Sequence, residues 1–599
     1  MYKAPVADIA FALKSISGLG ASIEDGRAGG LSLDLLDAIL EEAGRFATEE
    51  VAPLAGIGDT EGARAENGRV TTPKGWADLY RRWAEGGWNG LTGPESHGGQ
   101  GLPVALSAAV FEMWNSASMA FALGPMLTVG AVEAIAAHGS DELKAIYLEK
   151  LVTGAWMGTM NLTEPAAGSD LAALRTRAER AGDGSYRIFG QKIYITYGEH
   201  DWTDNIVHLV LARLPDAPAG VKGISLFLVP KFLVGADGSL GARNDVFCHS
   251  IEHKLGIHGS PTCTMIYGDG TGETGEAGAI GWLVGEENKG LACMFTMMNN
   301  ARLHVGTQGV GIAEAATQQA IAFAGERRQG RSSAGTAGAM SPIIEHPDIQ
   351  RMLLTMKALT AAARAITFAC GHAIDRSHDE SAGDGERAEW RDRAHLLTPI
   401  AKAFPTDVGV EVASLGIQVH GGMGFIEETG AARHYRDVRI APIYEGTNGI
   451  QAIDLVMRKL PLSGGGAVAA YLSELEETIE AVRGANRPDF GRTAEALSEG
   501  LADLRAATAF LAEQLAAKQT DPALAGATPY LKLFGLVAGA VYLARGALVE
   551  AGADERVALA RFMAENLLAE TAGLKRQVTE GAASLKAAAS AVLGTGIAA

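Results

Sequence analysis

Cysteine is scarce in this chain of 599 residues, which contains four: Cys248, Cys263, Cys293 and Cys370. They are scattered, and no two have CxxC spacing. This pattern excludes a zinc knuckle and a disulfide framework, and it suits a reducing compartment. We therefore expect no metal site, and we expect the cysteines to be small buried apolar residues.

Positive charge is also in deficit, because 51 Lys and Arg residues stand against 70 Asp and Glu residues, for a formal net charge of -19. Phosphate binding requires a basic surface, so this balance argues against nucleic acid as a partner. Asp8 and Lys14 interrupt the opening apolar stretch, which is therefore no signal peptide. No uncharged apolar run approaches the length of a membrane span, so we expect a cytoplasmic protein without one.

A dinucleotide-binding fingerprint is missing as well. No GxGxxG motif follows an early strand, so a nicotinamide-binding Rossmann domain has little support, and any redox cofactor must be bound by other means. Hydrophobic residues make up 47% and charged residues 20% of the chain, which is typical of a soluble globular protein. The length predicts more than one domain.

Apolar periodicity divides the chain into four regions. We expect an N-terminal helical domain over residues 1–156, a β domain over 157–285, a helix bundle over 286–462 and a C-terminal helical extension over 467–599. In the first region Ser32 is placed to cap a helix, and two more helices are expected around residues 104–119 and 128–139. Short β-branched segments such as YRIFGQKIYIT and GISLFLVP predict antiparallel strands. The predicted fold is mainly α with a small central antiparallel β domain.

One carboxylate stands in apolar sequence, in the stretch RIAPIYEGTNGIQAID. Glu445 is the only charged residue between Arg439 and Asp454, and a buried carboxylate without a partner is expensive. One interpretation is a glutamate in an ion pair with Arg436 or Arg439 at a helix start. The other is a functional acid next to a tight glycine turn.

Two motifs of the β region could bind a ligand. MNLTEPAAGSD, residues 160–170, offers backbone amides and hydroxyls that suit the edge of a planar heterocycle, or it is an ordinary turn. YIT, residues 194–196, ends a strand and needs no ligand by itself.

The helical region holds three further candidates. QVHGGMG, residues 418–424, is a helix C-terminal cap, or it lets a diphosphate approach bare backbone amides. Arg327 suits a solvated helix end. Asn299 and Arg302 lie one helical turn apart and form either a polar helix face or a ligand contact.

The order of these regions, together with MNLTEPAAGSD, QVHGGMG and IYEGTNG, resembles the acyl-CoA dehydrogenase family, flavoenzymes that oxidise the α,β bond of an acyl-CoA thioester. The resemblance covers about residues 30–460 and implies N-terminal helices, a β barrel and a C-terminal four-helix bundle. The tail after Gly466 and the segment KLGIHGSPT look like a longer bacterial branch of the family, which includes 3-methylthiopropanoyl-CoA dehydrogenases.

The resemblance implies FAD as the cofactor, with an implied binding set of Leu162, Thr163, Gly168, Ser169, Tyr194, Ile195, Thr196, Arg327, Gln418, Gly421, Gly422, Thr447 and Gly449. The implied acyl-CoA contacts are Ser169, Asn299, Arg302, Tyr444 and Gly446. Two positions depart from the family pattern. Tyr194 stands where many members have Trp, and the usual Phe before Gly330 is missing, so that Arg328 could replace Arg327.

By the same resemblance Glu445 is the catalytic base. It would remove the α proton while the β hydride passes to flavin N5, giving a trans-2-enoyl-CoA. A dry pocket would raise the pKa of this carboxyl, and its backbone amide could help to hold the developing oxyanion. The implied partners are an electron-transfer flavoprotein and further copies of the chain, as a homodimer or a homotetramer.

Three questions stay open at this point. The substrate is either an ordinary fatty acyl-CoA or a short sulfur-containing thioester. A flavoprotein of the same fold that binds DNA in stress protection would need a basic stripe, against which the acidic total and Glu445 both argue. A helical scaffold without enzymatic activity would not need the IYEGTNG pocket.

Overall fold

The computed structural model describes residues 2–333, 340–549 and 554–594. These residues form two compact units whose segments alternate along the chain. The sheet unit contains residues 45–103 and 117–304. The helical unit contains residues 2–44 and 104–116 and the described residues from 305 onward.

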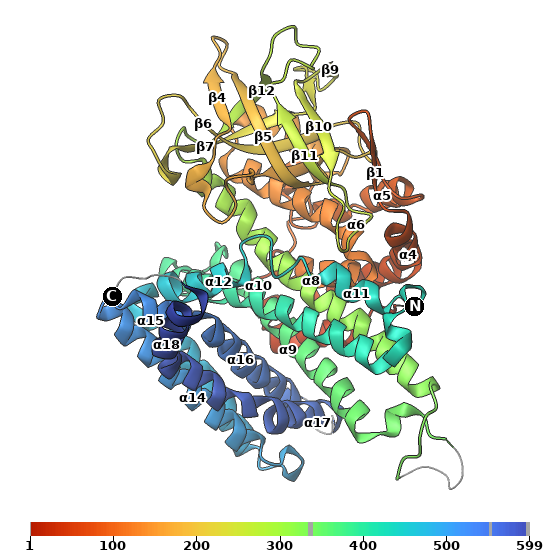
Figure 1. Cartoon of the computed structure of the whole chain (residues 1–599), viewed down its shortest axis with the longest axis vertical. Coiled ribbons are helices and arrows are strands. Elements are labelled where there is room, and N and C mark those ends of the chain that lie inside the picture. The colour runs from red at the N-terminus through yellow and green to blue at the C-terminus, as the bar shows by residue number, and fades with distance from the viewer. Residues whose placement is uncertain (1, 334–339, 550–553, 595–599) are drawn as a thin grey trace. The chain divides into compact units, whose positions relative to one another are not determined.

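The sheet unit is built on an 8-stranded sheet with the order β10-β11-β5-β12-β7-β6-β3, in which β4 pairs with both β5 and β6 (Figure 1). Its strands are β3 (Met157–Asn161), β4 (Arg177–Arg180), β5 (Tyr186–Thr196), β6 (Ile206–Arg213), β7 (Ile224–Pro230), β10 (Val246–Ile251), β11 (Thr262–Tyr267) and β12 (Ala279–Val284). Two small hairpins join β1 (Arg64–Glu66) to β2 (Arg69–Thr71) and β8 (Phe232–Val234) to β9 (Leu240–Arg243).

The predicted β domain is confirmed, with one difference in strand direction. Most neighbours are antiparallel, but β6 pairs in parallel with β3 and, through one residue pair, with β4. Because the chain between β3 and β6 passes through β4 and β5, it can return in the same direction, which a tight hairpin would not allow. Buried apolar side chains such as Ile188, Val210 and Phe227 form the core of this unit.

The remaining helices of the sheet unit are α4 (Ala52–Glu61), α5 (Trp76–Glu85) and α7 (Asp141–Val152). Two long helices, α6 (Val104–His138) and α8 (Gly290–Glu326), have residues in both units. The expectation of two helices over the α6 region is confirmed in part. Non-helical backbone at Ser118 divides α6 near the predicted end of the first helix, but the second helix begins before residue 128 and includes Pro125.

The helical unit contains an N-terminal group, α1 (Val6–Phe11), α2 (Leu19–Glu24) and α3 (Leu33–Phe46). Ser32 caps α3 as expected, because its Oγ accepts a hydrogen bond from the Leu35 amide at 3.1 Å. Two long neighbouring helices follow, α9 (Pro347–Ser377) and α10 (Asp384–His420), and then α11 (Ala431–Val438) and α12 (Asn448–Asp454).

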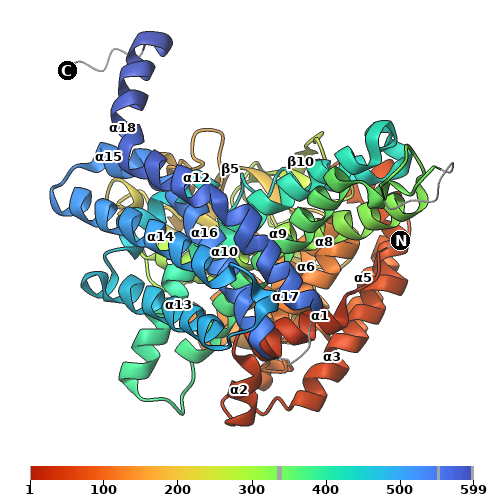
Figure 2. The same cartoon turned by 90° about the horizontal axis from the view of Figure 1, so that it is seen from below.

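The C-terminal extension adds a further helical layer to this unit. Its helices are α13 (Gly466–Gly484), α14 (Thr493–Ala516), α15 (Thr520–Ala525), α16 (Ala527–Val549), α17 (Asp554–Phe562) and α18 (Thr571–Leu593). α16 packs against α9 and α10, and α14 and α18 cover α16 (Figure 2). Glycines permit the close approach: a Cβ at Gly535 would lie 2.3 Å from Phe404, and one at Gly539 would lie 2.6 Å from Ala362.

Three described helices are long and apolar enough to cross a membrane by length and composition: Val104–His138, Pro347–Ser377 and Ala527–Val549. The expectation that no segment approaches this length and hydropathy was therefore wrong. Their most apolar windows are 89%, 83% and 78% buried inside the protein, so this apolar surface forms core contacts. The four cysteines are free and buried, as predicted.

The glycine contact of α16 provides a test of how the extension is attached. We expect Gly539→Val to destabilise the protein by about 1–3 kcal/mol, because the new side chain overlaps Ala362 on α9. Urea unfolding measures the change. The matched control is Gly581→Val on α18, where an added Cβ meets nothing within 4 Å. Equal stability of the two variants would contradict the described packing of α16.

Candidate active site

Glu445 lies in the loop between α11 and α12 of the helical unit. Its backbone is left-handed, with φ of 55°, and Gly446 continues the turn with φ of 82°. A residue other than glycine in this region costs about 1–3 kcal/mol and persists only where its surroundings hold it. The side chain is half-buried, and its Oε2 atom is shielded from solvent. The loop therefore directs one carboxylate oxygen into the protein at a conformational cost.

Side chains on α12 hold the turn from its C-terminal side. Thr447 Oγ1 accepts a hydrogen bond from the Ile450 amide at 3.2 Å and caps α12. Gln451 Nε2 donates to the Glu445 and Gly446 carbonyls at 3.3 Å and 3.4 Å. The start of α12 and the Glu445 turn thus form one hydrogen-bonded piece.

Tyr444 places an aromatic ring next to Glu445 in the sequence. Its hydroxyl donates a hydrogen bond to Oε1 of Gln308, a fully buried residue of α8. Burial and the negative charge of Glu445 raise the pKa of Tyr444 well above its usual value, so the phenol stays neutral. The alternative interpretation was an ion pair between Glu445 and Arg436 or Arg439. Arg436 forms an ion pair with a different carboxylate, that of Glu427, at 2.7 Å.

In the sheet unit, a buried ion pair fixes the loop that contains Leu162 and Thr163. Lys192 on β5 is fully buried, and its Nζ donates to Glu164 at 2.8 Å and to the Leu162 carbonyl at 3.0 Å. The Ile193 amide donates to the Thr163 carbonyl at 2.9 Å. The loop is therefore joined to the end of β5, where Tyr194, Ile195 and Thr196 lie.

Tyr194 departs from the plain strand expected for YIT. Its φ is 61°, and the pairing of β5 with β11 shifts register between Ile195 and Lys192. The resulting bulge leaves 60% of Tyr194 exposed while Ile195 is buried. Gly168 and Ser169, later in the neighbouring loop, are also exposed, and a Cβ at Gly168 would meet nothing within 4 Å.

The glycine motif at the end of α10 presents open backbone. Gln418, Gly421 and Gly422 are exposed, and a Cβ at either glycine would meet nothing within 4 Å. His420, between Gln418 and Gly421, is buried and stacks on Phe323 with ring centroids 4.4 Å apart, so it is a packed core residue.

The two arginines that follow α8 are both exposed. Arg328 Nη1 donates to the Met340 carbonyl at 3.2 Å, whereas Arg327 contributes backbone hydrogen bonds to Phe323 and Ile343. The Arg327 guanidinium can therefore reach a ligand more readily than that of Arg328.

Asn299 and Arg302 lie together on α8 in the sheet unit, with Arg302 Nη1 3.4 Å from Asn299 Oδ1. Arg302 is buried and lies over the ring of Phe295, whereas Asn299 is exposed. The neighbouring Met294, Met297 and Met298 are buried core residues.

Each of the two units thus brings together some of the predicted site residues. Tyr444, Glu445, Gly446, Thr447 and Gly449 share one loop, while the loop from residue 162 to 169 lies beside the end of β5. Sequence reasoning missed Gln308, Lys402, Asn448 and Gln451, which support the Glu445 loop. For Lys402 the sequence contained a signal, because this lysine lies inside the apolar helical stretch TPIAKAFP.

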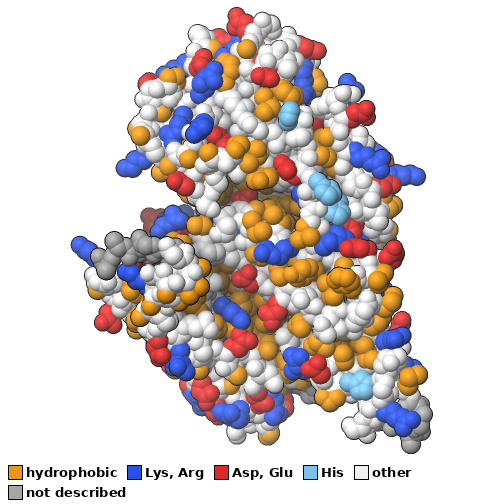
Figure 3. All heavy atoms as spheres, viewed as in Figure 1, with side chains coloured by type: hydrophobic (Ala, Val, Ile, Leu, Met, Phe, Trp, Pro, Cys, Tyr) orange, Lys and Arg blue, Asp and Glu red, His pale blue; other side chains and the backbone are white. Residues whose placement is uncertain are grey.

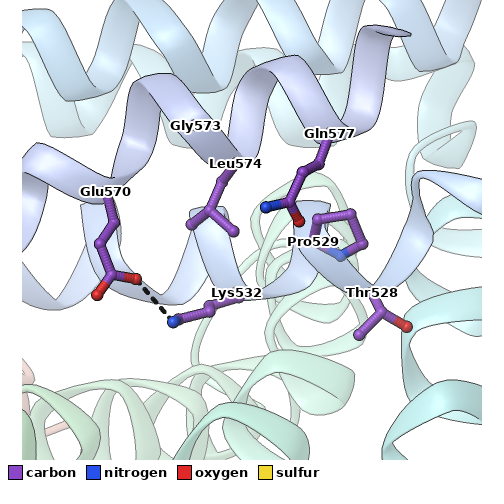
Figure 4. Close-up of a pocket in the computed structure, with 7 residues that line it drawn as sticks. All are labelled: Thr528, Pro529, Lys532, Glu570, Gly573, Leu574 and Gln577. Carbon is purple, nitrogen blue, oxygen red and sulfur yellow. Dashed lines mark hydrogen bonds and ion pairs between the residues drawn. The ribbon is translucent and has the colours of Figure 1, made fainter. Parts of the chain in front are cut away.

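A cavity of about 460 Å³ lies elsewhere, between α16 and α18 (Figure 4). Its lining includes the Lys532–Glu570 ion pair together with Pro529, Leu574 and Gln577. None of the predicted site residues lines it, so it is separate from the chemistry of Glu445.

Comparison with known proteins identifies the family. Models for the N-terminal, middle and C-terminal domains of acyl-CoA dehydrogenase match residues 34–155, 159–269 and 288–460, and an acetyl-CoA dehydrogenase C-terminal-like model matches residues 471–589. The 3-methylmercaptopropionyl-CoA dehydrogenase of Ruegeria pomeroyi is 48% identical over 98% of this chain and 99% of that protein. The chain belongs to the acyl-CoA dehydrogenase family.

Two other acyl-CoA dehydrogenases are similar over most of their length. The broad-specificity linear acyl-CoA dehydrogenase FadE5 of Mycobacterium tuberculosis is 32% identical over 95% of each chain. A solved structure of an acyl-CoA dehydrogenase complexed with FAD from Bacillus anthracis shares the fold, with a TM-score of 0.71 and 22% identity over 93% of this chain and 91% of that one. The predicted fold class and the oxidoreductase class are confirmed. FAD, the predicted cofactor, is bound in the Bacillus anthracis structure.

The residues present fit FAD. A bulged strand exposes the Tyr194 ring, and the exposed loop through Gly168 offers unobstructed backbone for a planar ring system. Gly421 and Gly422 offer unobstructed amides of the kind that bind a diphosphate.

The Lys192–Glu164 pair gives a testable consequence in this acyl-CoA dehydrogenase. We expect Lys192→Met to destabilise the protein by about 3–5 kcal/mol, because it leaves Glu164 buried without its cation. Burial alone would raise the pKa of Glu164, but Lys192 and neighbouring hydrogen bonds lower it below its usual value. The stabilising contribution of Glu164 is therefore present at neutral pH and is lost as the pH falls through its depressed pKa.

Thermal or urea unfolding at neutral pH measures this effect. The double variant Glu164→Gln/Lys192→Met should recover part of the lost stability, because no charge then remains buried. A single Lys192→Met variant as stable as the wild type would show that the pair does not hold the loop.

Proposed function

We propose that this chain is an FAD-dependent acyl-CoA dehydrogenase in which Glu445 removes the α proton of the substrate. The observation that carries the proposal is the carboxylate of Glu445, held on left-handed backbone with one oxygen shielded from solvent. A carboxylate deprived of hydration is a stronger base, and proton abstraction next to a thioester carbonyl needs such a base.

In this mechanism the electrons of the α C–H bond form the new double bond while Glu445 takes the proton. Bound FAD supplies the hydride acceptor for the β hydrogen. The Glu445 amide lies on the same turn and can donate to the thioester oxygen as it gains negative charge. Gly446 lets the thioester approach the backbone, and Tyr444 helps to exclude water from the carboxylate.

Leu162, Thr163, Gly168, Ser169 and the end of β5 from Tyr194 to Thr196 would hold the flavin ring. Arg327, Gln418, Gly421 and Gly422 would hold the diphosphate of the cofactor in a second copy of the chain, with Thr447 and Gly449 close to the flavin. Such an arrangement requires at least a homodimer, and the family resemblance also allows a homotetramer. Ser169, Asn299 and Arg302 would contact the CoA portion of the substrate.

A short sulfur-containing thioester, 3-methylthiopropanoyl-CoA, is the proposed substrate, supported by the 48% identity to a protein named for the equivalent activity. Linear acyl-CoAs are the second candidate, because a relative with 32% identity is named for them. The proposed electron acceptor is an electron-transfer flavoprotein, and the proposed location is the cytoplasm.

The DNA-binding alternative receives no support from the charge distribution. On the face shown in Figure 3, the Lys and Arg side chains of the described residues are scattered among Asp and Glu side chains and form no continuous basic stripe. Such a stripe is what phosphate binding would require.

The substitution Glu445→Gln tests the function. Purified wild-type protein should be yellow and should lose its colour on addition of an acyl-CoA substrate. The variant should keep the yellow colour, and its bleaching rate should fall by about 10²–10⁴-fold, the usual contribution of a general base. The matched control is Glu428→Gln at an exposed position, which should bleach as fast as the wild type.

A panel of acyl-CoA thioesters distinguishes the substrates in the same assay. A higher kcat/KM for 3-methylthiopropanoyl-CoA than for butanoyl-CoA or longer chains would support the sulfur-containing substrate, and the reverse order would favour linear acyl-CoAs. A colourless protein, or undiminished bleaching by Glu445→Gln, would contradict the proposed function.

A further inference from the structure

A buried lysine on α10 contacts both ends of the Glu445 loop. Lys402 is fully buried, and its Nζ donates a hydrogen bond to the Ala441 carbonyl at 2.9 Å and to Asn448 Oδ1 at 2.9 Å. Ala441 precedes Glu445 and Asn448 follows it. One ammonium group therefore joins the two sides of the loop.

Asn448 extends this contact along α10. Its Nδ2 lies within donating distance of the Ala403 carbonyl at 3.2 Å, Thr406 Oγ1 at 3.0 Å and Asp407 Oδ1 at 2.7 Å. The first residue of α12 is thus attached to consecutive turns of α10. Because Thr447 and Gln451 bind the turn to α12, these contacts reach the backbone of Glu445 itself.

Burying an ammonium group is costly. An apolar side chain at position 402 would fill the same buried space at a smaller cost in solvation free energy. The left-handed backbone of Glu445 also needs an external restraint, because it would otherwise relax toward a more favourable region. A lysine that binds both ends of the loop supplies that restraint.

We propose that Lys402 is a positioning residue of the reaction: with Asn448 it fixes the Glu445 loop on α10 and thereby holds the base where it can remove the α proton. This inference rests on the proposed function of Glu445. Lys402 contacts neither substrate nor cofactor in this role and acts through the backbone of the loop.

The experiment separates proton removal from the rest of the reaction. An acyl-CoA with sulfur in place of the β carbon cannot lose a β hydride but can exchange its α protons with solvent. Exchange in D₂O, followed by NMR or mass spectrometry, therefore reports on the base alone. The FAD-loaded, full-length protein is used, and the dissociation constant of the thioester is measured in parallel.

We expect Lys402→Met to slow α-proton exchange by about 10²-fold, the effect of a displacement of the reacting groups by about 1 Å. Thioester affinity and FAD content should change less than threefold. Asn448→Ala removes the hydrogen bond from Lys402 to Asn448 but keeps the one to the Ala441 carbonyl, so it should slow exchange by a smaller factor. This second variant decides the question if Lys402→Met does not fold.

Lys532→Met is the matched control, because it makes the same chemical change at a partly exposed lysine of α16 and should leave exchange unchanged. Wild-type exchange rates in Lys402→Met or, if that variant does not fold, in Asn448→Ala would overturn the inference. So would a loss of exchange that only parallels lost FAD or lost affinity, since that marks a structural role. Glu445→Gln separates the two proposals: if it still exchanges, the proposed function fails, whereas if it alone is inactive, only the role of Lys402 fails.

Discussion

The candidate active site depends on a carboxylate that the fold keeps in an unfavourable environment. Glu445 has a left-handed backbone, is half-buried, and has one oxygen shielded from solvent. Each of these features has a conformational or solvation cost, and each is what a base acting on a weakly acidic C–H bond requires. Hydrogen bonds of four side chains hold the loop that carries this carboxylate: those of Tyr444, Gln451, Lys402 and Asn448.

The order of the helical and β regions could be predicted from the sequence alone. β5 and β7 fall where β-branched segments predicted strands, and Ser32 caps the helix that was expected to begin after it. These features are local: periodicity, capping and turn chemistry act over a few residues and can be recognised without tertiary structure. IYEGTNG was identifiable for the same reason, because one charge in an apolar stretch is a local anomaly.

Features that depend on contacts across the chain were not predicted. Lys402 and Asn448 are 46 residues apart, and nothing in the sequence indicates that one ammonium binds both ends of a loop. The bulge that exposes Tyr194 arises from the pairing of β5 with β11, so the strand pattern alone predicted a plain alternation. The second part of α6 includes Pro125, although its helix was expected to begin after that proline, because tertiary packing outweighed the local preference.

The C-terminal extension illustrates how the fold uses its most apolar segments. α16 is apolar enough to cross a membrane, yet 78% of its most apolar window is buried, and Gly535 and Gly539 allow it to approach α10 and α9 closely. The extension thus shares a core with the helices that carry the Glu445 loop. α10, which supports that loop, contacts α16 on the same unit.

A crystal structure of the FAD-loaded protein with a bound thioester whose β carbon is replaced by sulfur would test the central claim most directly. We expect a Glu445 carboxylate oxygen about 3–3.5 Å from the α carbon of the thioester, the separation of reacting atoms poised for transfer. A Glu445 side chain directed into solvent, with a different acid next to that carbon, would contradict it.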